Sequence, residues 1–285
     1  MLSIRLLETP QDLQPLEDLQ RQIWSGSETD VVPLHLLVTA VHNGGLILGA
    51  FQNEKMIGFV FGFPGLEFTP DGPRPKHCSH MLGVLAEHRN SGAGFALKRA
   101  QWQMIRRQEL DHITWTYDPL LSANARLNIA KLGAVCSVYR REEYGQMRDG
   151  LNAGLPSDRF QVDWWIHTPR VARRLGDRPR PALNMTHIAK SGLRPSYAAP
   201  LTGKWIRPPE QIPPLEKRLL LAPIPADFLA LKAEDLALAR DWRFFARELF
   251  ESAFAQGYII TDFAFDAQRG YYLLTHGESA LDQFE

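Results

Sequence analysis

The sequence predicts a protein of the α+β class, a mixed α/β fold built on a mixed sheet, with a smaller C-terminal α/β module. Short apolar runs typical of strands recur along the chain, and amphipathic segments with helical spacing separate some of them. The two kinds of segment do not alternate regularly, which argues against a simple series of βαβ units. The 285 residues, of which 45% are hydrophobic and 22% charged, suffice for one large domain or two smaller ones.

The elements of the first 168 residues follow from their apolar patterns and breakers. Pro10 and Pro33 each open a helix, and a turn at residues 43–45 leads into a hairpin. A segment rich in proline and glycine, residues 64–75, is expected to be irregular. The expected strands are residues 2–7, 46–51, 56–63, 77–85, 113–117, 135–139 and 160–166, and the further helices are residues 92–108 and 123–132.

A change of composition after residue 168 sets the predicted domain boundaries. Residues 169–215 are rich in proline, which lacks a backbone donor, so we expect an irregular connection there. A strand, a long amphipathic helix (residues 234–256) and a closing hairpin form a module over residues 216–285. Such a module is small, so we expect the helix to pack on the 1–168 domain or across a homodimer. Its apolar stripe is Leu238, Trp242, Phe245, Leu249, Ala253 and Phe254.

Charge and cysteine content exclude several classes of function. Lysine plus arginine equals aspartate plus glutamate, 32 each, so no overall field favours nucleic acid. Cys78 and Cys136 are too few for a disulfide framework, which fits a reducing compartment. The sequence shows no signal-peptide pattern and no apolar run of membrane-spanning length. We therefore expect a cytoplasmic protein without nucleic-acid or membrane partners.

One loop between a predicted strand and a predicted helix indicates anion binding. Free backbone N–H groups and a partial positive charge mark a helix start, and glycine lets the backbone approach phosphate oxygens. An arginine in the loop can add charge-assisted hydrogen bonds. The loop is neither a P-loop nor a dinucleotide-binding loop, since Leu97 stands where the latter needs a third glycine. The alternative is a turn kept for packing. The loop reads Arg89, Asn90, Ser91, Gly92, Ala93, Gly94.

The context of this loop resembles the acyl-CoA-binding core of the GNAT acetyltransferase superfamily. The strand at residues 81–85, the loop and the following helix have the GNAT order, and residues 124–134 resemble its asparagine-led helix ending in a Lys-x-Gly turn. The resemblance covers residues 1–167. It implies a splayed sheet that holds the pantetheine of acetyl-CoA or another acyl-CoA, with no metal. The implied contacts are Val84 and Leu85 to the pantetheine, residues 89–94 to the pyrophosphate, and Asn124 near the thioester.

The sequence departs from the GNAT pattern at the position of the general acid. Many members place a tyrosine four residues before the glycine of the second motif, and Ile129 stands there in this chain. The nearest candidates to protonate the leaving thiolate are Tyr117, Tyr139 and Tyr144, each of which is otherwise a packing aromatic. A thiolate that leaves through water is the alternative.

The candidate base is His80, which lies on the predicted central strand in phase with Leu82 and Val84. Its ordinary pKa suits the deprotonation of an incoming ammonium. The alternative is a hydrogen-bonded core histidine. A metal site built on residues 77–80 is not expected, because no distant Cys or His pair completes a tetrahedral set.

Three charged residues are candidates for the acceptor site. Asp118 is placed to orient an amine, and Arg159 to hold a substrate carboxylate through its fork. Asp30 lies in the helix–helix loop (residues 25–30) that lines acceptor sites in GNAT proteins. The alternatives are a turn former before Pro119 for Asp118, a structural ion pair for Arg159, and a solvated loop charge for Asp30.

The combined features predict an acyl-CoA N-acyltransferase that transfers an acetyl, succinyl or other small acyl group directly to a small-molecule amine. Residues 115–120, 131–134 and 155–160 followed by Trp164 resemble a GNAT branch with a C-terminal extension, most members of which are described only as predicted acetyltransferases. Some relatives succinylate amino acids, which suggests an amino-acid acceptor. Two alternatives stay open, a non-catalytic acyl-CoA sensor or scaffold and an interaction protein with a vestigial loop.

Overall fold

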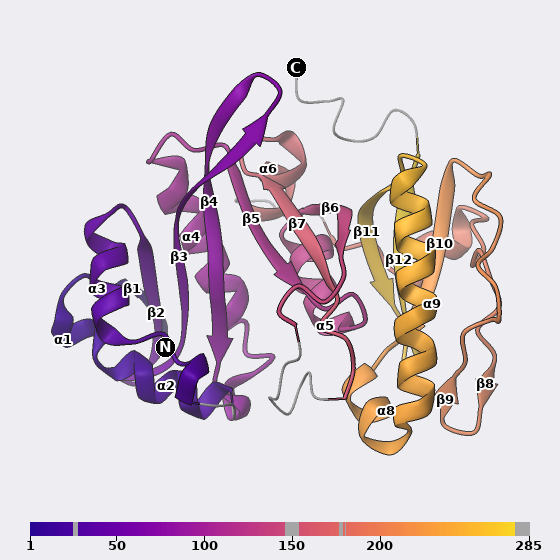
Figure 1. The fold of residues 1–285 in the computed structure, drawn as a ribbon, viewed down its shortest axis with the longest axis horizontal. Coiled ribbons are helices and arrows are strands. Elements are labelled where there is room, and N and C mark those ends of the chain that lie inside the picture. Colours follow the sequence, from indigo (N-terminus) through magenta and orange to yellow (C-terminus); the bar gives the residue numbers. More distant parts are fainter. Residues whose placement is uncertain (25–27, 146–153, 177–178, 180, 277–285) are drawn as a thin grey trace. The chain divides into compact units, whose positions relative to one another are not determined.

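The computed structural model describes residues 1–24, 28–145, 154–176, 179 and 181–276. They form two compact units, the first comprising Met1–Trp115 with Trp165–His167, and the second most of the chain from Thr116 onward. Each unit combines helices with a sheet, so the predicted α+β class is confirmed (Figure 1). The predicted domain boundaries at residues 168 and 216 stay a prediction. None of the described helices combines the length and the apolar character that a bilayer crossing requires.

The first unit follows the predicted order of elements. Its elements are β1 (Leu2–Leu6), α1 (Pro10–Leu13), α2 (Pro15–Ile23), η1 (Glu28–Asp30), α3 (Leu34–His42), β2 (Leu46–Gln52), β3 (Lys55–Thr69), β4 (Gly72–Val84), η2 (Ala86–His88), α4 (Ala93–Arg106) and the start of β5 (His112–Tyr117). The strands are ordered β1-β2-β3-β4-β5, and all neighbours are antiparallel except β4 and β5. Residues 25–27 of the predicted polar loop lie outside the described residues.

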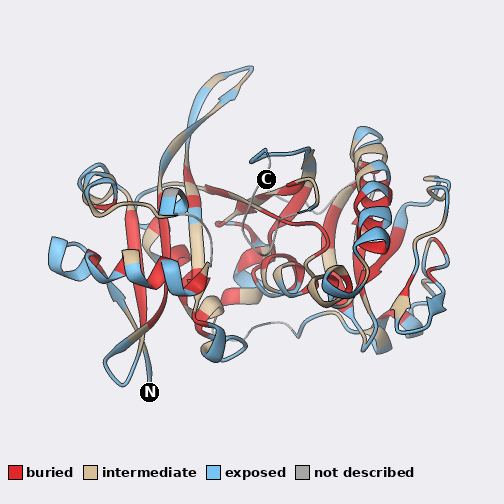
Figure 2. Cartoon of the chain, turned by 60° about the horizontal axis from the view of Figure 1, so that its bottom comes forward, coloured by how far each residue is buried: buried red, intermediate tan, exposed pale blue. Residues whose placement is uncertain are grey.

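Two sets of helices pack on the sheet of the first unit. Leucines of α1, α2 and α3 form one apolar cluster with Ile47, Phe59 and Phe61 of β2 and β3. Helix α4 contacts β1, β2, β3 and β4, and it buries Leu97 and Ile105. Figure 2 shows these buried residues as red stretches on the strands and on the inward helix faces. The periodicity seen in the sequence therefore marks the buried faces correctly.

The second unit contains a run of antiparallel strands and a long helix. Its elements are the end of β5, α5 (Ser122–Ala125), η3 (Arg126–Lys131, a π-helical segment), β6 (Val135–Arg140), β7 (Arg159–Trp165), α6 (Pro169–Leu175), α7 (Met185–Lys190), β8 (Leu201–Thr202), β9 (Trp205–Ile206), β10 (Leu219–Pro225), α8 (Phe228–Glu234), α9 (Leu236–Ala255), β11 (Ile259–Phe265) and β12 (Arg269–Thr275). Strands β7, β6, β11, β12 and β10 lie side by side in that order with antiparallel neighbours.

The core of the second unit centres on Phe160 of β7. Its ring makes edge contacts with Phe250 and Tyr272 at centroid distances of 4.8 and 5.6 Å, and it also contacts Phe254. The predicted strand, helix and hairpin of the C-terminal module are all present as β10, α9 and β11–β12. Within this unit they share one core with β7, because residues of α9 and β12 surround Phe160.

The structure differs from the predicted elements in four places. Residues 64–75 are not irregular but form the outer half of a long β3–β4 hairpin, paired from Phe63 with Cys78 to Thr69 with Gly72. Prolines are tolerated there because the described pairing of β2 and β5 ends short of this half, so both outer edges need no donors. The first helix is divided by Pro15 into α1 and α2. The segment predicted to be irregular, residues 169–215, contains two short helices, α6 and α7, and the two-stranded sheet β8–β9. In addition, α8 precedes α9.

Candidate functional site

The predicted phosphate loop presents an open helix start at α4. Gly92 is the N-cap, with φ of 90°, and Asn90 has φ of 62°, so the chain turns sharply into the helix. Arg89, Asn90 and Gly92 are exposed. Among the described residues, the N–H groups of Gly94 and Phe95 have no hydrogen-bond acceptor. A helix start with free donors, positive dipole and a neighbouring arginine is suited to an anion.

Strands β4 and β5 diverge next to this loop. Their pairing joins only His77 and Cys78 to Ile113 and Thr114, while β4 itself continues to Val84. The part of β4 beyond residue 78 is therefore unpaired on its β5 side within the first unit. The pantetheine contacts that the resemblance implies at Val84 and Leu85 lie at the end of this part of the strand and stay a prediction. The N–H of Leu85 already donates to Ile57 O (2.9 Å), so a pantetheine contact at Leu85 would fall to its carbonyl.

A buried polar cluster fixes α4 to the back of β4. Lys98 Nζ donates to Ser79 Oγ (2.8 Å) and to Gln101 Oε1 (3.1 Å), and Gln101 Nε2 lies 3.1 Å from His77 Nε2. Burial lowers the pKa of Lys98 well below its ordinary value. Burial, with the nearby Lys98, lowers the pKa of His77 to about 3. The cluster holds the helix whose N-terminus carries the predicted phosphate loop.

His80 occupies a bulge on β4. The register with β3 shifts between Phe61 and Phe63, which inserts an extra residue on β4 at this point. The shift breaks the simple alternation from which the phase of His80 with Leu82 was predicted. The exposed imidazole packs against Phe61 and Phe63 at centroid distances of 5.8 Å, and this partial desolvation lowers its pKa.

The candidate acids differ in accessibility. Tyr117 is buried, its hydroxyl lies 3.1 Å from that of Tyr272, and burial raises its pKa well above the ordinary value. Tyr144 is 52% exposed, and its hydroxyl lies 2.7 Å from Thr116 Oγ1. The hydroxyl of Tyr139 donates to Asp158 Oδ2 (2.8 Å). Tyr144 is therefore the accessible phenol of the three.

The second GNAT-like motif forms α5 and the π-helical segment that follows. Asn124 is half-buried on α5, and Ile129 is fully buried. Gly133 ends the helix with φ of 79°. Arg174 of α6 donates from Nε to Ala130 O (3.1 Å), and Arg170 donates from Nε to Gly133 O (2.8 Å). Cations at a helix C-terminus are favourable, so the arginine-rich segment after residue 168 serves as a cap.

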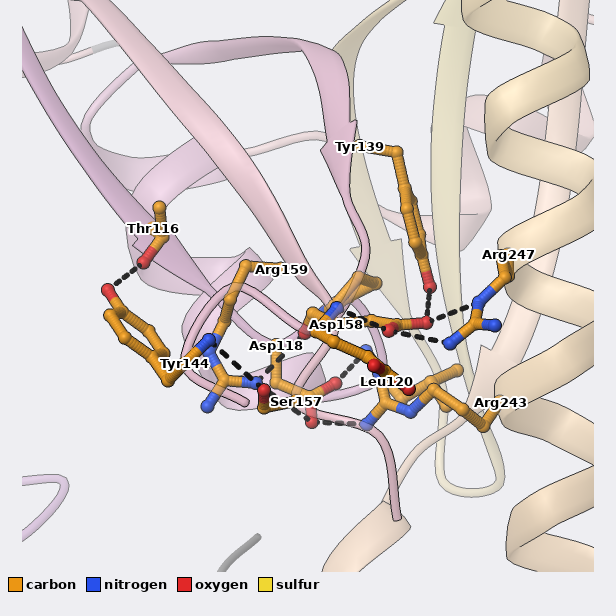
Figure 3. Close-up of polar contacts among 12 residues, drawn as sticks. Thr116, Asp118, Leu120, Tyr139, Tyr144, Ser157, Asp158, Arg159, Arg243 and Arg247 are labelled. Carbon is orange, nitrogen blue, oxygen red and sulfur yellow. Dashed lines mark hydrogen bonds and ion pairs between the residues drawn. The ribbon is translucent and has the colours of Figure 1, made fainter. Parts of the chain in front are cut away.

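The predicted acceptor residues Asp118 and Arg159 lie together in the second unit (Figure 3). Asp118 Oδ1 accepts from Leu120 N (2.9 Å), and Oδ2 accepts from Arg243 Nη2 and lies 4.0 Å from Arg159 Nη1. Arg159 lies 5.4 Å from the Tyr144 ring centroid. Asp118 thus forms both a turn and an ion pair. Asp30 is exposed and lies on η1 of the first unit.

The sequence did not reveal that two arginines of α9, Arg243 and Arg247, form ion pairs with the neighbouring carboxylates. Arg247 donates to both oxygens of Asp158 at 2.9 and 2.8 Å, and Arg243 is 2% exposed. The two side chains stand four residues apart, so they share one side of α9. Their position beside the apolar stripe of Trp242 and Leu249 was the available signal. Among the described residues, no group of three metal-ligating side chains is present.

Comparisons with known proteins find structural likenesses. No protein-family model matches the sequence. No curated protein matches it. An Escherichia coli ribosomal-protein alanine N-acetyltransferase is 17% identical with a TM-score of 0.44, covering 59% of this chain and 96% of the other. NAA60 from Arabidopsis thaliana is 16% identical (TM-score 0.43, 58% and 99% covered), and a GNAT-family acetyltransferase from Streptococcus pneumoniae is 15% identical (TM-score 0.43, 57% and 98% covered). These values say nothing about substrate.

Proposed function

We propose that this chain is a GNAT-type acyl-CoA-dependent N-acyltransferase, which moves an acetyl, succinyl or other small acyl group to the amine of a small molecule such as an amino acid. The observation that carries the proposal is the exposed start of α4. Gly92 turns the chain, Gly94 leaves its N–H without a partner among the described residues, and Arg89 adds a cation. These features favour the pyrophosphate of coenzyme A.

The divergence of β4 and β5 supports the same proposal. A thioester arm that runs from the α4 site along the unpaired side of β4 would find backbone groups to bind, in the manner of an added strand. A free nucleotide has no arm of this kind to bind along a strand. This supports an acyl-CoA over a free nucleotide.

The reaction is a direct transfer. The lone pair of the neutral acceptor amine attacks the thioester carbonyl carbon, the C–S bond breaks, and the amine loses one proton while the thiolate gains one. His80 accepts the proton of the incoming ammonium, since its lowered pKa keeps it neutral near pH 7. Tyr144 donates to the thiolate in preference to Tyr117, because only Tyr144 is accessible.

The second candidate function is a non-catalytic acyl-CoA sensor. One observation favours it: Ile129 is fully buried and aliphatic at the position where GNAT members carry their acid. A descendant that only binds acyl-CoA has no need of an acid there.

One assay separates these functions. Acetyl-CoA or succinyl-CoA is incubated with the purified chain and with free amino acids, simple amines or peptides, and thiol release is followed. Release with amino acids supports the proposal in full, whereas release only with peptides contradicts the small-molecule acceptor. Coenzyme A binding without release for any amine supports the sensor. A chain that binds no coenzyme A would leave only the interaction protein.

We further propose a cytoplasmic location, which the two free thiols of Cys78 and Cys136 support. Homodimer formation stays a prediction. Light scattering of the purified chain measures it directly.

A further inference from the structure

A pocket lies beside β10, the last strand in the sheet order of the second unit. Its volume is about 610 Å³, which is within the range of small-molecule sites. Its walls come from residues 195–200, from Pro223 of β10, and from Arg269 and Tyr271 of β12. Pro223 lies opposite Tyr271, and Arg269 stands two residues from Tyr271, so these three side chains share one face of the sheet.

Proline explains why this pocket stays open. Residues 195–200 meet the outer edge of β10 at one position, where Ser196 N donates to Leu221 O (2.8 Å) and Leu221 N donates to Ser196 Oγ (2.9 Å). Pro223 has no N–H, so this pairing does not continue along β10 as a ladder. The hydroxyl of Tyr197 donates to Pro223 O instead. The two segments are therefore joined there through a side chain, and the pocket lies where their backbones part.

The tyrosines of the pocket are fixed and neutral. The hydroxyl of Tyr271 donates to Asp266 Oδ2 (2.9 Å), and burial together with Asp266 raises the pKa of Tyr271 to about 12. The other oxygen of Asp266 accepts from the N–H groups of Gln268 and Arg269, each at 2.8 Å. Because the hydroxyl of Tyr197 is also in use, the tyrosines and prolines offer a ligand mainly carbon.

Arg269 is the only charged side chain among the described residues that line the pocket. Its Nη2 donates to Ala199 O (3.1 Å), and its Nη1 donates to Gln268 Oε1 (3.4 Å). A guanidinium has further N–H donors, and Arg269 has no carboxylate partner within the described part of the chain. A guanidinium that a backbone carbonyl holds in place, with donors still open, is suited to bind a carboxylate.

We propose that this pocket is a second binding site, which takes a small organic acid with one carboxylate and an apolar body. Arg269 binds the carboxylate, and the tyrosine and proline side chains hold the apolar body. One cation balances a monoanion, whereas a phosphate dianion would keep an unbalanced charge. The inference goes beyond the proposed acyl transfer, because the pocket belongs to the second unit and the start of α4 to the first.

The first test compares two acids with their neutral counterparts. Benzoate, hexanoate, benzyl alcohol and hexanol are titrated separately into the full chain by calorimetry. At least one acid should bind, and its alcohol should bind at least about tenfold more weakly, because it lacks the charge-assisted hydrogen bond. A preference for benzoate or for hexanoate assigns the apolar body as aromatic or aliphatic. Binding of neither acid, or equal affinity for an acid and its alcohol, overturns the proposal.

Two variants test the pocket residues themselves. Arg269→Gln should weaken binding of the acid by about tenfold or more and leave the affinity for the alcohol unchanged, and Arg240→Gln on the exposed side of α9 is its control. Ala198→Trp adds a bulky side chain to an exposed part of the wall and should weaken binding of acid and alcohol alike. Ala237→Trp, also exposed on α9, is the matched control. Unchanged binding of the acid by either pocket variant contradicts the proposal, and Ala198→Trp decides if Arg269→Gln does not fold.

A last comparison separates this pocket from the predicted phosphate loop. Gly94→Trp should bind the acid as the wild type does, because no residue of the loop 89–94 lines the pocket. Loss of acid binding in a folded Gly94→Trp would place the acid at α4 and overturn the proposal. A chain that binds the acid but releases no thiol with any amine keeps the pocket and removes the acyltransferase.

Discussion

Replacing Asp158 with asparagine should cost more stability than any single hydrogen bond of the second unit. Asp158 is fully buried, and its carboxylate accepts four hydrogen bonds, two of them from Arg247. Asparagine keeps the shape but leaves Arg247 without its counter-ion. Breaking a buried ion pair in this way costs about 3–5 kcal/mol. The side chain of Arg247 is 16% exposed, so water offsets part of the loss and the lower end is expected.

A graded comparison makes this prediction specific. Tyr139→Phe removes one hydrogen bond to a charged group and leaves Arg247 paired, so it should cost about 1.5 kcal/mol, roughly half as much. Glu234→Gln alters an exposed pair with Lys204 and serves as the control, with no measurable loss expected. Urea denaturation followed by tryptophan fluorescence measures all three. Trp164 and Trp242 are fully buried in the second unit and report on it.

The pH dependence gives an independent check on Asp158. Burial alone would raise its pKa, but hydrogen bonds from Arg247, Tyr139 and Glu142 lower it overall. A carboxyl with a lowered native pKa stabilises the fold above its unfolded pKa of about 3.9, and this stabilisation is lost as the pH falls through the native value. The gap between wild type and Asp158→Asn should therefore narrow in acid. A gap below about 1 kcal/mol at pH 7, or one that stays constant in acid, would refute the reasoning.

Three further predictions concern the base, the buried lysine and the C-terminal module. His80→Gln should lower kcat/KM by about 10²-fold or more. In the wild type, the acidic limb of the pH–rate profile should lie below about pH 6.5, since the pKa of His80 is lowered, and the variant should lack this limb. A limb that persists in the variant places the base elsewhere. Because the pKa of Lys98 is lowered in the native state, the unfolded state binds more protons, and the stability of the wild type should rise from pH 7 to pH 9. Lys98→Met should abolish this rise, as measured by urea denaturation at both pH values. A rise that is unchanged in the variant would contradict the prediction. Fragments 1–168 and 210–285 should not fold when expressed separately, because Phe160 would lose its contacts with Phe250 and Tyr272. Exposing each aromatic side chain to water costs about 1.5–3 kcal/mol. Two soluble, monomeric and cooperatively folded fragments would disprove this.

The elements that the sequence predicts well are those with a strong periodic pattern. The stripe of Leu238, Trp242 and Leu249 is buried on α9, and the C-terminal strands lie where their apolar runs placed them. The prediction that residues 64–75 are irregular was wrong, because the rule that excludes proline from strands assumes a strand with neighbours on both sides. Sequence alone does not reveal that both outer edges are open there.

The sequence predicts some parts of the candidate site and not others. The loop around Gly92 follows from local chemistry, and its backbone geometry agrees with that expectation. The partners of Asp118 do not follow from local chemistry, because Arg243 lies 125 residues away and reaches Asp118 only through tertiary packing. The phase of His80 also depends on a bulge, which no alternating pattern shows. Long-range ion pairs and register shifts are set by the whole fold rather than by neighbours in the sequence.

Calorimetric titration of coenzyme A into the wild type and into Gly94→Trp tests the central claim most directly. The indole at the start of α4 would keep the pyrophosphate from the free N–H groups of residues 94 and 95. Gly65→Trp is the matched control, since a side chain added there meets open space. We expect binding by the wild type and by Gly65→Trp, and at least about a tenfold loss, equivalent to about 1.4 kcal/mol, for a folded Gly94→Trp. Equal affinity of all three proteins would contradict the assignment of this site.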